Sequence, residues 1–90
     1  MAFKPKEDSK PVKQFRCGAL SVAIWKREHK DGVFYSVTPS RSYKEKDSEE
    51  WSYSDSLNYD DLPVMAQLLN MAFAWITVER AKAASEANRD

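Results

Sequence analysis

One segment near the end of the chain, residues 62–78 (LPVMAQLLNMAFAWITV), limits the possible folds more than any other. Its pattern predicts a helix, and only Gln67, Asn70 and Thr77 among its seventeen positions are clearly polar. A helix that covers one face of a small sheet needs a single apolar stripe. This helix is apolar over most of its circumference, so two surfaces must cover it. In a chain of 90 residues with no second helix of this kind, the sequence predicts a homodimer through the helices.

The helical periodicity divides these apolar residues into two stripes. The stripe expected to cover the sheet contains Leu62, Met65, Ala66, Leu69, Ala72, Phe73 and Ile76. The dimer interface is expected to contain Leu68, Met71, Ala72 and Trp75. Asp60 is the expected N-cap, because a carboxylate there accepts hydrogen bonds from amides of the first turn.

The residues before the helix alternate with the two-residue period of strands. Segment 15–28 (FRCGALSVAIWKRE) predicts one strand with Leu20, Val22 and Ile24 on the same face. The opposite face is nearly bare of bulky side chains until Trp25. "HKDG" predicts a turn, and "VFYSVTPSRSY" the partner strand, in which Pro39 indicates a bulge or an edge.

A third extended stretch, "WSYSDSL", leaves the count at three to four strands. The predicted fold class is therefore α+β, an antiparallel sheet followed by one long C-terminal helix. The expected divisions are a flexible basic tail over 1–13, a sheet-plus-helix domain over 14–80 and a charged tail over 81–90.

Composition narrows the class of protein further. The single cysteine, Cys17, excludes an internal disulfide framework, favours a cytoplasmic location and is expected to be buried. Polar residues interrupt every apolar run before it reaches the length of a membrane span, so we expect no membrane partner. One histidine and two glycines leave no metal cluster and no phosphate-binding loop. We therefore expect no enzyme and no cofactor.

The net charge is zero, but the charges are unevenly distributed. Residues 1–16 hold five basic and two acidic groups, and residues 25–46 hold six basic and three acidic groups. Residues 47–61 hold six acidic groups and no basic group. A neutral total therefore combines a basic tail, a basic first hairpin and an acidic segment before the helix.

Aromatic rings stand among the polar residues of segment 36–54 (SVTPSRSYKEKDSEEWSYS). Single-stranded nucleic acid exposes bases that stack on such rings whatever the sequence, and lysine or arginine between the rings neutralises phosphates. The same rings have structural alternatives. Trp25 suits the rim of a core, Tyr43 suits cross-strand packing, and Trp51 and Tyr53 share a parity with Leu57 that suits a core or a dimer interface.

The blocks "FRCGALSVAIWKRE", "DGVFYSVTPSRSYK" and "SLNYDDL" followed by the apolar helix, about residues 15–78, resemble a known family. It comprises the eukaryotic transcriptional coactivator positive cofactor four, the plant Whirly proteins and short phage and bacterial homologues. The resemblance implies a homodimer whose curved sheets bind single-stranded DNA without sequence preference, in replication, recombination or transcription. It also implies a host-cell cytoplasmic location for a phage homologue, with a replication or transcription protein as a further partner.

The resemblance assigns DNA contacts to Trp25, Lys26, Arg41, Tyr43 and Lys44. The remaining candidate contacts are Arg27, Lys46, Trp51 and Tyr53. Before the last strand, relatives often carry glycines and basic residues. This chain has "SEEWSYSDS" there, which contains no basic residue. The alternative is a dimeric adaptor or inhibitor that binds a protein through the acidic-aromatic segment 47–55.

Overall fold

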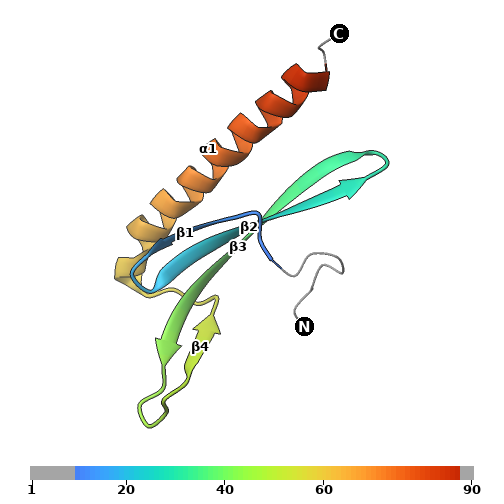
Figure 1. Ribbon diagram of the computed structural model, residues 1–90. Coiled ribbons are helices and arrows are strands. Elements are labelled where there is room, and N and C mark those ends of the chain that lie inside the picture. Colours follow the sequence, from blue (N-terminus) through green and yellow to red (C-terminus); the bar gives the residue numbers. More distant parts are fainter. Residues whose placement is uncertain (1–9, 88–90) are drawn as a thin grey trace.

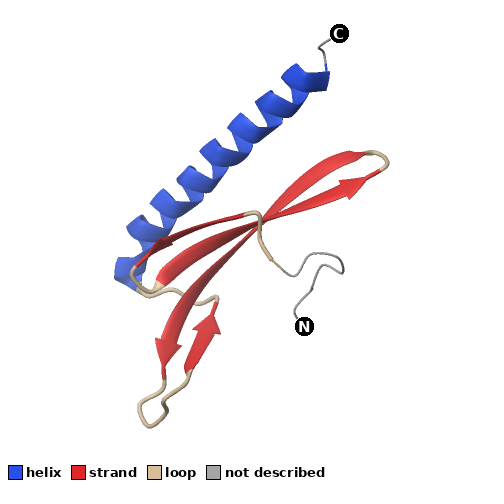
Figure 2. Ribbon diagram, in the orientation of Figure 1, coloured by secondary structure: helices blue, strands red, loops and turns tan. Residues whose placement is uncertain are grey.

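A computed structural model describes residues 10–87 (Figure 1). In chain order the elements are β1 (Lys13–Cys17), β2 (Leu20–His29), β3 (Gly32–Lys44), β4 (Trp51–Ser54), the 3-10 helix η1 (Tyr59–Asp61) and α1 (Leu62–Ala87). The strands form one antiparallel sheet in the order β1-β2-β3-β4. Figure 2 shows α1 lying along one side of this sheet. The α+β prediction of a sheet followed by one C-terminal helix is confirmed.

The segment predicted as one strand over 15–28 is two strands. Gly18 has a φ of +62°, a backbone conformation that other residues adopt at a cost, and the chain reverses there. Cys17 then pairs with Leu20, and the pairing continues to Lys13 with Ile24. Contrary to expectation, Cys17 is exposed at this turn.

The β2–β3 hairpin pairs without interruption from Leu20 with Arg41 to His29 with Gly32. Gly32 has a φ of +140° and closes the tight turn, as the "HKDG" signal predicted. Pro39 lies in this unbroken ladder opposite Val22, while β4 pairs only with positions 41–44 of β3. Pro39 therefore stands where β3 is an edge strand, and no bulge is needed to accommodate its missing amide hydrogen.

The core lies between α1 and the first half of β2. Leu20, Val22 and Ile24 are buried, which confirms the face predicted for them. From the helix, Met65, Leu68 and Ala72 complete the buried cluster. The stripe predicted for the sheet is wrong in part, because Leu62, Leu69 and Phe73 are exposed. A helix that is apolar all round gives no signal for its rotation, which packing on the sheet decides.

Of the four residues predicted for the dimer interface, two lie inside this core. Leu68 and Ala72 are buried against the protein's own sheet. Trp75 is partly buried, and its ring meets that of Tyr35 edge to face at 6.4 Å between centroids. Only Met71 is exposed.

The helix begins differently from the prediction that Asp60 caps it. Asn58 is the N-cap of η1, which runs directly into α1. The Asn58 amide donates to the Asp61 carboxylate at 2.9 Å, and the Asp61 amide donates to the Asn58 carbonyl at 3.0 Å. At the other end α1 continues beyond position 80 to Ala87. Of the tail predicted over 1–13, Lys13 belongs to β1, and residues 1–9 lie outside the described residues.

The helical segment Tyr59–Glu86 is long and apolar enough to cross a membrane, by length and composition only. Only 17% of its most apolar stretch is buried within the described part of the chain. Most of the surface of this segment is therefore exposed in the single chain. The polar residues inside the helix, on which the expectation of no membrane partner rested, leave this segment within the length and composition of a membrane span.

Candidate nucleic-acid interface

Strand pairing sorts the candidate residues onto two faces of the sheet. Residues paired across an antiparallel ladder point their side chains to the same side. One face carries Leu20, Val22 and Ile24 and is covered by α1. We call the other the open face. Its side chains include Arg16, Ser21, Ala23, Trp25, Arg27, Thr38, Ser40, Ser42, Lys44, Trp51 and Tyr53.

At the β4 end of the open face two large rings stand in solvent. Trp51 is 61% exposed and Tyr53 is 67% exposed. The Lys44 ammonium lies 5.9 Å from the centre of the Trp51 ring, within the range of a cation–π contact. The two rings therefore offer flat apolar surface next to a positive charge.

These rings line a depression of about 420 Å³. Its wall is formed by Arg16, Gly18, Ala19, Ser42, Trp51 and Tyr53, from β1, the β1–β2 turn, β3 and β4. Two hydrogen bonds fix the turn against β3: the Ser42 amide donates to the Ala19 carbonyl at 2.8 Å and the Ser42 hydroxyl to the same oxygen at 3.3 Å. The depression is thus built from elements that the sheet already holds in place.

Arg16 is a site residue that the sequence analysis missed. It is paired with Ser21, lines the depression and is exposed. Within residues 10–87 its guanidinium makes no hydrogen bond or ion pair. It therefore supplies a cation at the depression lined by Trp51 and Tyr53. Segment 47–55, which carries these two rings, has no basic residue of its own.

Between the two ends of the open face the floor is made of small and hydroxyl side chains. The Ser21 and Ser40 hydroxyls share a hydrogen bond of 3.1 Å. Further along, the Trp25 indole N–H donates to the Thr38 hydroxyl at 3.1 Å, which holds the ring in one orientation. Trp25 is partly buried, so part of its side-chain surface is open to solvent.

Lys26, Arg41 and Tyr43 lie on the face that carries the helix, opposite to the rings. Arg41 Nε donates to Asp61 Oδ2 at 2.9 Å, and both side chains are mostly buried. Lys26 Nζ lies 3.6 Å from Glu28 Oε2. The structure therefore separates these three predicted contacts from Trp25, Arg27, Lys44, Trp51 and Tyr53, which share the open face.

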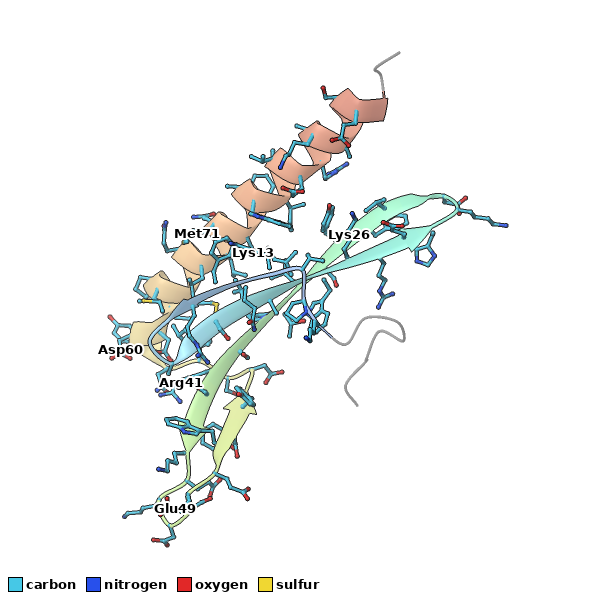
Figure 3. All side chains as sticks on the ribbon, in the orientation of Figure 1. Lys13, Lys26, Arg41, Glu49, Asp60 and Met71 are labelled. Carbon is cyan, nitrogen blue, oxygen red and sulfur yellow. The ribbon has the colours of Figure 1, made fainter. Side chains whose placement is uncertain are left out.

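The last predicted contact, Lys46, lies in the exposed β3–β4 loop with Asp47, Glu49 and Glu50. Figure 3 shows Glu49 at the tip of this loop and Arg41 near the start of the helix. The acidic loop therefore extends beyond the ring end of the open face.

No protein-family model, curated protein or solved structure matches this chain. Within residues 10–87, no group of three or more histidine, cysteine, aspartate or glutamate side chains is placed to hold a metal ion.

Proposed function

We propose that this protein binds single-stranded DNA without sequence preference through the open face of its sheet, as a homodimer held together by α1. One observation carries the proposal. Two strongly exposed rings, Trp51 and Tyr53, line a depression that also contains Arg16, with Lys44 over one ring. A stacking surface with adjacent cations is what a base and its phosphate need.

The rest of the open face suits an extended strand. From Lys44 to Ser36, β3 spans roughly 26 Å at about 3.3 Å per residue. Its floor of serine, alanine and threonine side chains leaves room for a sugar–phosphate backbone and offers hydroxyl hydrogen bonds. None of these contacts depends on the identity of a base, which favours binding of any sequence.

The dimer part of the proposal rests on the second covering that α1 needs. The exposed residues Leu62, Leu69 and Phe73 recur at helical spacing along one side of α1. A lipid bilayer is the less favourable cover, because α1 packs on a sheet whose edge strands β1 and β4 would bring unpaired backbone groups into hydrocarbon. We therefore assign the cover to a second copy of the chain, with an interface displaced from Leu68 and Ala72.

The test is the fluorescence of Trp51 during titration with a short oligothymidine. In a variant carrying Trp25→Phe and Trp75→Phe, Trp51 is the only tryptophan. Stacking should quench its emission in a saturable way. In a second measurement, unlabelled oligothymidine should displace a fluorescently labelled oligothymidine from the protein. A matched variant that keeps only Trp75 should show little change, because that ring packs on Tyr35. Binding that leaves Trp51 emission unchanged, or no binding, would contradict the proposal.

The exposed acidic loop favours one other function, the binding of a basic protein segment by an adaptor or inhibitor. Asp47, Glu49 and Glu50 directly precede Trp51. In that case oligothymidine should leave the fluorescence unchanged, whereas an oligolysine peptide should change it. The same titration therefore separates the two functions.

A further inference from the structure

The distal half of the β2–β3 hairpin projects beyond the rest of the protein. β1 pairs only with positions 20–24 of β2, and β4 only with positions 41–44 of β3. The buried core likewise reaches no further along β2 than Ile24. Figure 1 shows the far end of this hairpin extending away from both the helix and the other strands. The tip is a two-stranded ribbon with little covering on either face.

This ribbon carries exposed apolar side chains on both faces of its tip. Phe34 is 53% exposed on the open face, and its neighbour Val33 is 47% exposed on the opposite face. A solvated hairpin end is usually polar, because apolar groups gain nothing there. At this projecting tip Phe34 and Val33 therefore leave apolar surface in contact with solvent.

The ring of Phe34 is held in place by its neighbours. His29 meets it edge to face, with centroids 5.6 Å apart and ring planes at 67°. The two-residue turn between His29 and Gly32 keeps the strands in register up to the tip. Such a ring loses little freedom on binding.

We propose that the hairpin tip stacks on the terminal base pair of a duplex, at the point where single-stranded DNA joins double-stranded DNA. The inference rests on the proposed function, because it extends the single-strand surface to its end. Phe34 lies on the same face as Trp25 and Trp51, so a strand that follows this face arrives at the tip. Arg27 is paired with Phe34, and Lys30 is exposed in the turn.

Phenylalanine at a projecting position has the chemistry for this contact. Apolar side chains such as phenylalanine insert at base steps and replace base stacking with stacking on the protein. A duplex end offers an unstacked base pair, so contact there costs no unstacking. The cations beside the ring favour the higher phosphate density of the duplex.

The experiment compares four labelled DNA molecules by fluorescence anisotropy: an oligothymidine, a blunt duplex, and that duplex with the same oligothymidine as a 5′ or a 3′ tail. We expect one tailed duplex to bind about fivefold to tenfold more tightly than the oligothymidine alone, the gain of one modest stacking contact. Phe34→Ala should remove this gain while leaving the affinity for oligothymidine unchanged within about twofold. Phe34→Trp should keep the gain.

Val33→Ala is the matched control, because it removes an equally exposed apolar side chain from the other face of the same tip. It should leave the preference for the tailed duplex intact. Equal binding of tailed duplexes and oligothymidine would overturn the inference and leave the proposed function standing. A gain that survives Phe34→Ala would also overturn it. A change in oligomeric mass caused by Phe34→Ala would overturn it too, because the tip would then be a contact between copies of the chain. No binding to oligothymidine would overturn both proposals.

Discussion

Three positions on β3 separate Arg41 from Lys44, and this odd spacing places their charges on opposite faces of the sheet. Arg41 pairs with Asp61 at the start of the helical region. Lys44 lies over Trp51 on the open face. In the sequence motif "SRSYK" the two basic residues look equivalent. In the structure Arg41 pairs with an acidic residue of the same chain, whereas Lys44 lies beside the exposed rings.

Lys44→Ala should weaken binding to every single-stranded sequence alike. The log–log dependence of the binding constant on salt should become shallower by about 0.7 if one phosphate contact is lost. Anisotropy titrations of oligothymidine and a mixed-sequence strand at several salt concentrations measure both effects. If Lys44→Ala binds as tightly as the parent protein and with the same salt dependence, Lys44 is not part of the interface.

Arg41→Ala should act on stability instead. Its loss leaves the mostly buried Asp61 carboxylate with one hydrogen-bond donor fewer, which typically costs about 1–3 kcal/mol. Urea unfolding should reveal this loss, while the salt dependence of DNA binding should remain that of the parent protein. A changed salt slope with unchanged stability would return Arg41 to the list of DNA contacts.

The alternation of side chains along β2 was predicted correctly, but the face of Arg16 was missed. If segment 15–28 were one strand, Arg16 would share the face of Leu20 and Val22. The reversal at Gly18 pairs Arg16 with Ser21 instead and brings it to the open face. The glycine signal was present in "FRCGAL", and treating it as a turn would have found the missing cation.

The β1–β2 turn depends on this glycine, and its replacement offers a test. Gly18 has a positive φ, and nothing lies within 4 Å of the place where a Cβ would stand. Gly18→Ala should therefore cost about 1–2 kcal/mol through backbone strain alone. Gly18→Asn should cost less, because asparagine tolerates this conformation better. Urea unfolding of the two variants provides the comparison, and equal stability of both with the parent protein would contradict it.

Helix α1 presents two neighbouring leucines in opposite situations. Leu68 is 3% exposed in the core, whereas Leu69 is 40% exposed. Leu68→Ala should lower the free energy of unfolding by about 2–5 kcal/mol, since it opens a cavity in a small core. Leu69→Ala should lower it less and act through dimerisation. Urea unfolding at two protein concentrations separates these effects, because only a dimer's midpoint depends on concentration. Equal losses would mean that the helix packs with a different rotation.

That residues 62–78 form a helix could be predicted from their pattern, whereas the continuation to Ala87 and the rotation of the helix were not. Apolar residues at nearly every position leave the hydrophobic period without a preferred direction. The rotation is decided by which side chains fit between Leu20, Val22 and Ile24 of the sheet, and this information lies in the packing of distant segments. Leu68, predicted for the interface, therefore lies in the core, while Leu69 and Phe73, predicted for the sheet, are exposed.

Considered as a whole, the molecule has the exposed rings Trp51 and Tyr53 on one side of the sheet and helix α1, with its exposed apolar residues, on the other. If two copies join through their helices, their open faces point away from the contact and both remain accessible. This arrangement would let one dimer hold two strands, or two stretches of one strand. DNA binding and dimerisation are then separable by mutation, because they use opposite sides of the sheet.

Phe73 provides the sharpest test of this separation. It is 72% exposed on α1, away from both the core and the open face, and a charge there should be tolerated by the monomer fold but not at a helix–helix contact. Phe73→Arg should therefore reduce the mass measured by light scattering at micromolar concentration from two chains to one, with the helical circular dichroism largely retained.

Thr77→Arg is the control, because this exposed position carries a polar side chain and adds the same charge one turn further along the helix. It should disturb the dimer less than Phe73→Arg does. Binding of a short oligothymidine should still quench the Trp51 emission of the Phe73→Arg monomer, because its open face is intact. A parent protein that is a well-folded monomer at micromolar concentration would contradict the dimer, whereas a dimer unaffected by Phe73→Arg would place the contact elsewhere on the chain.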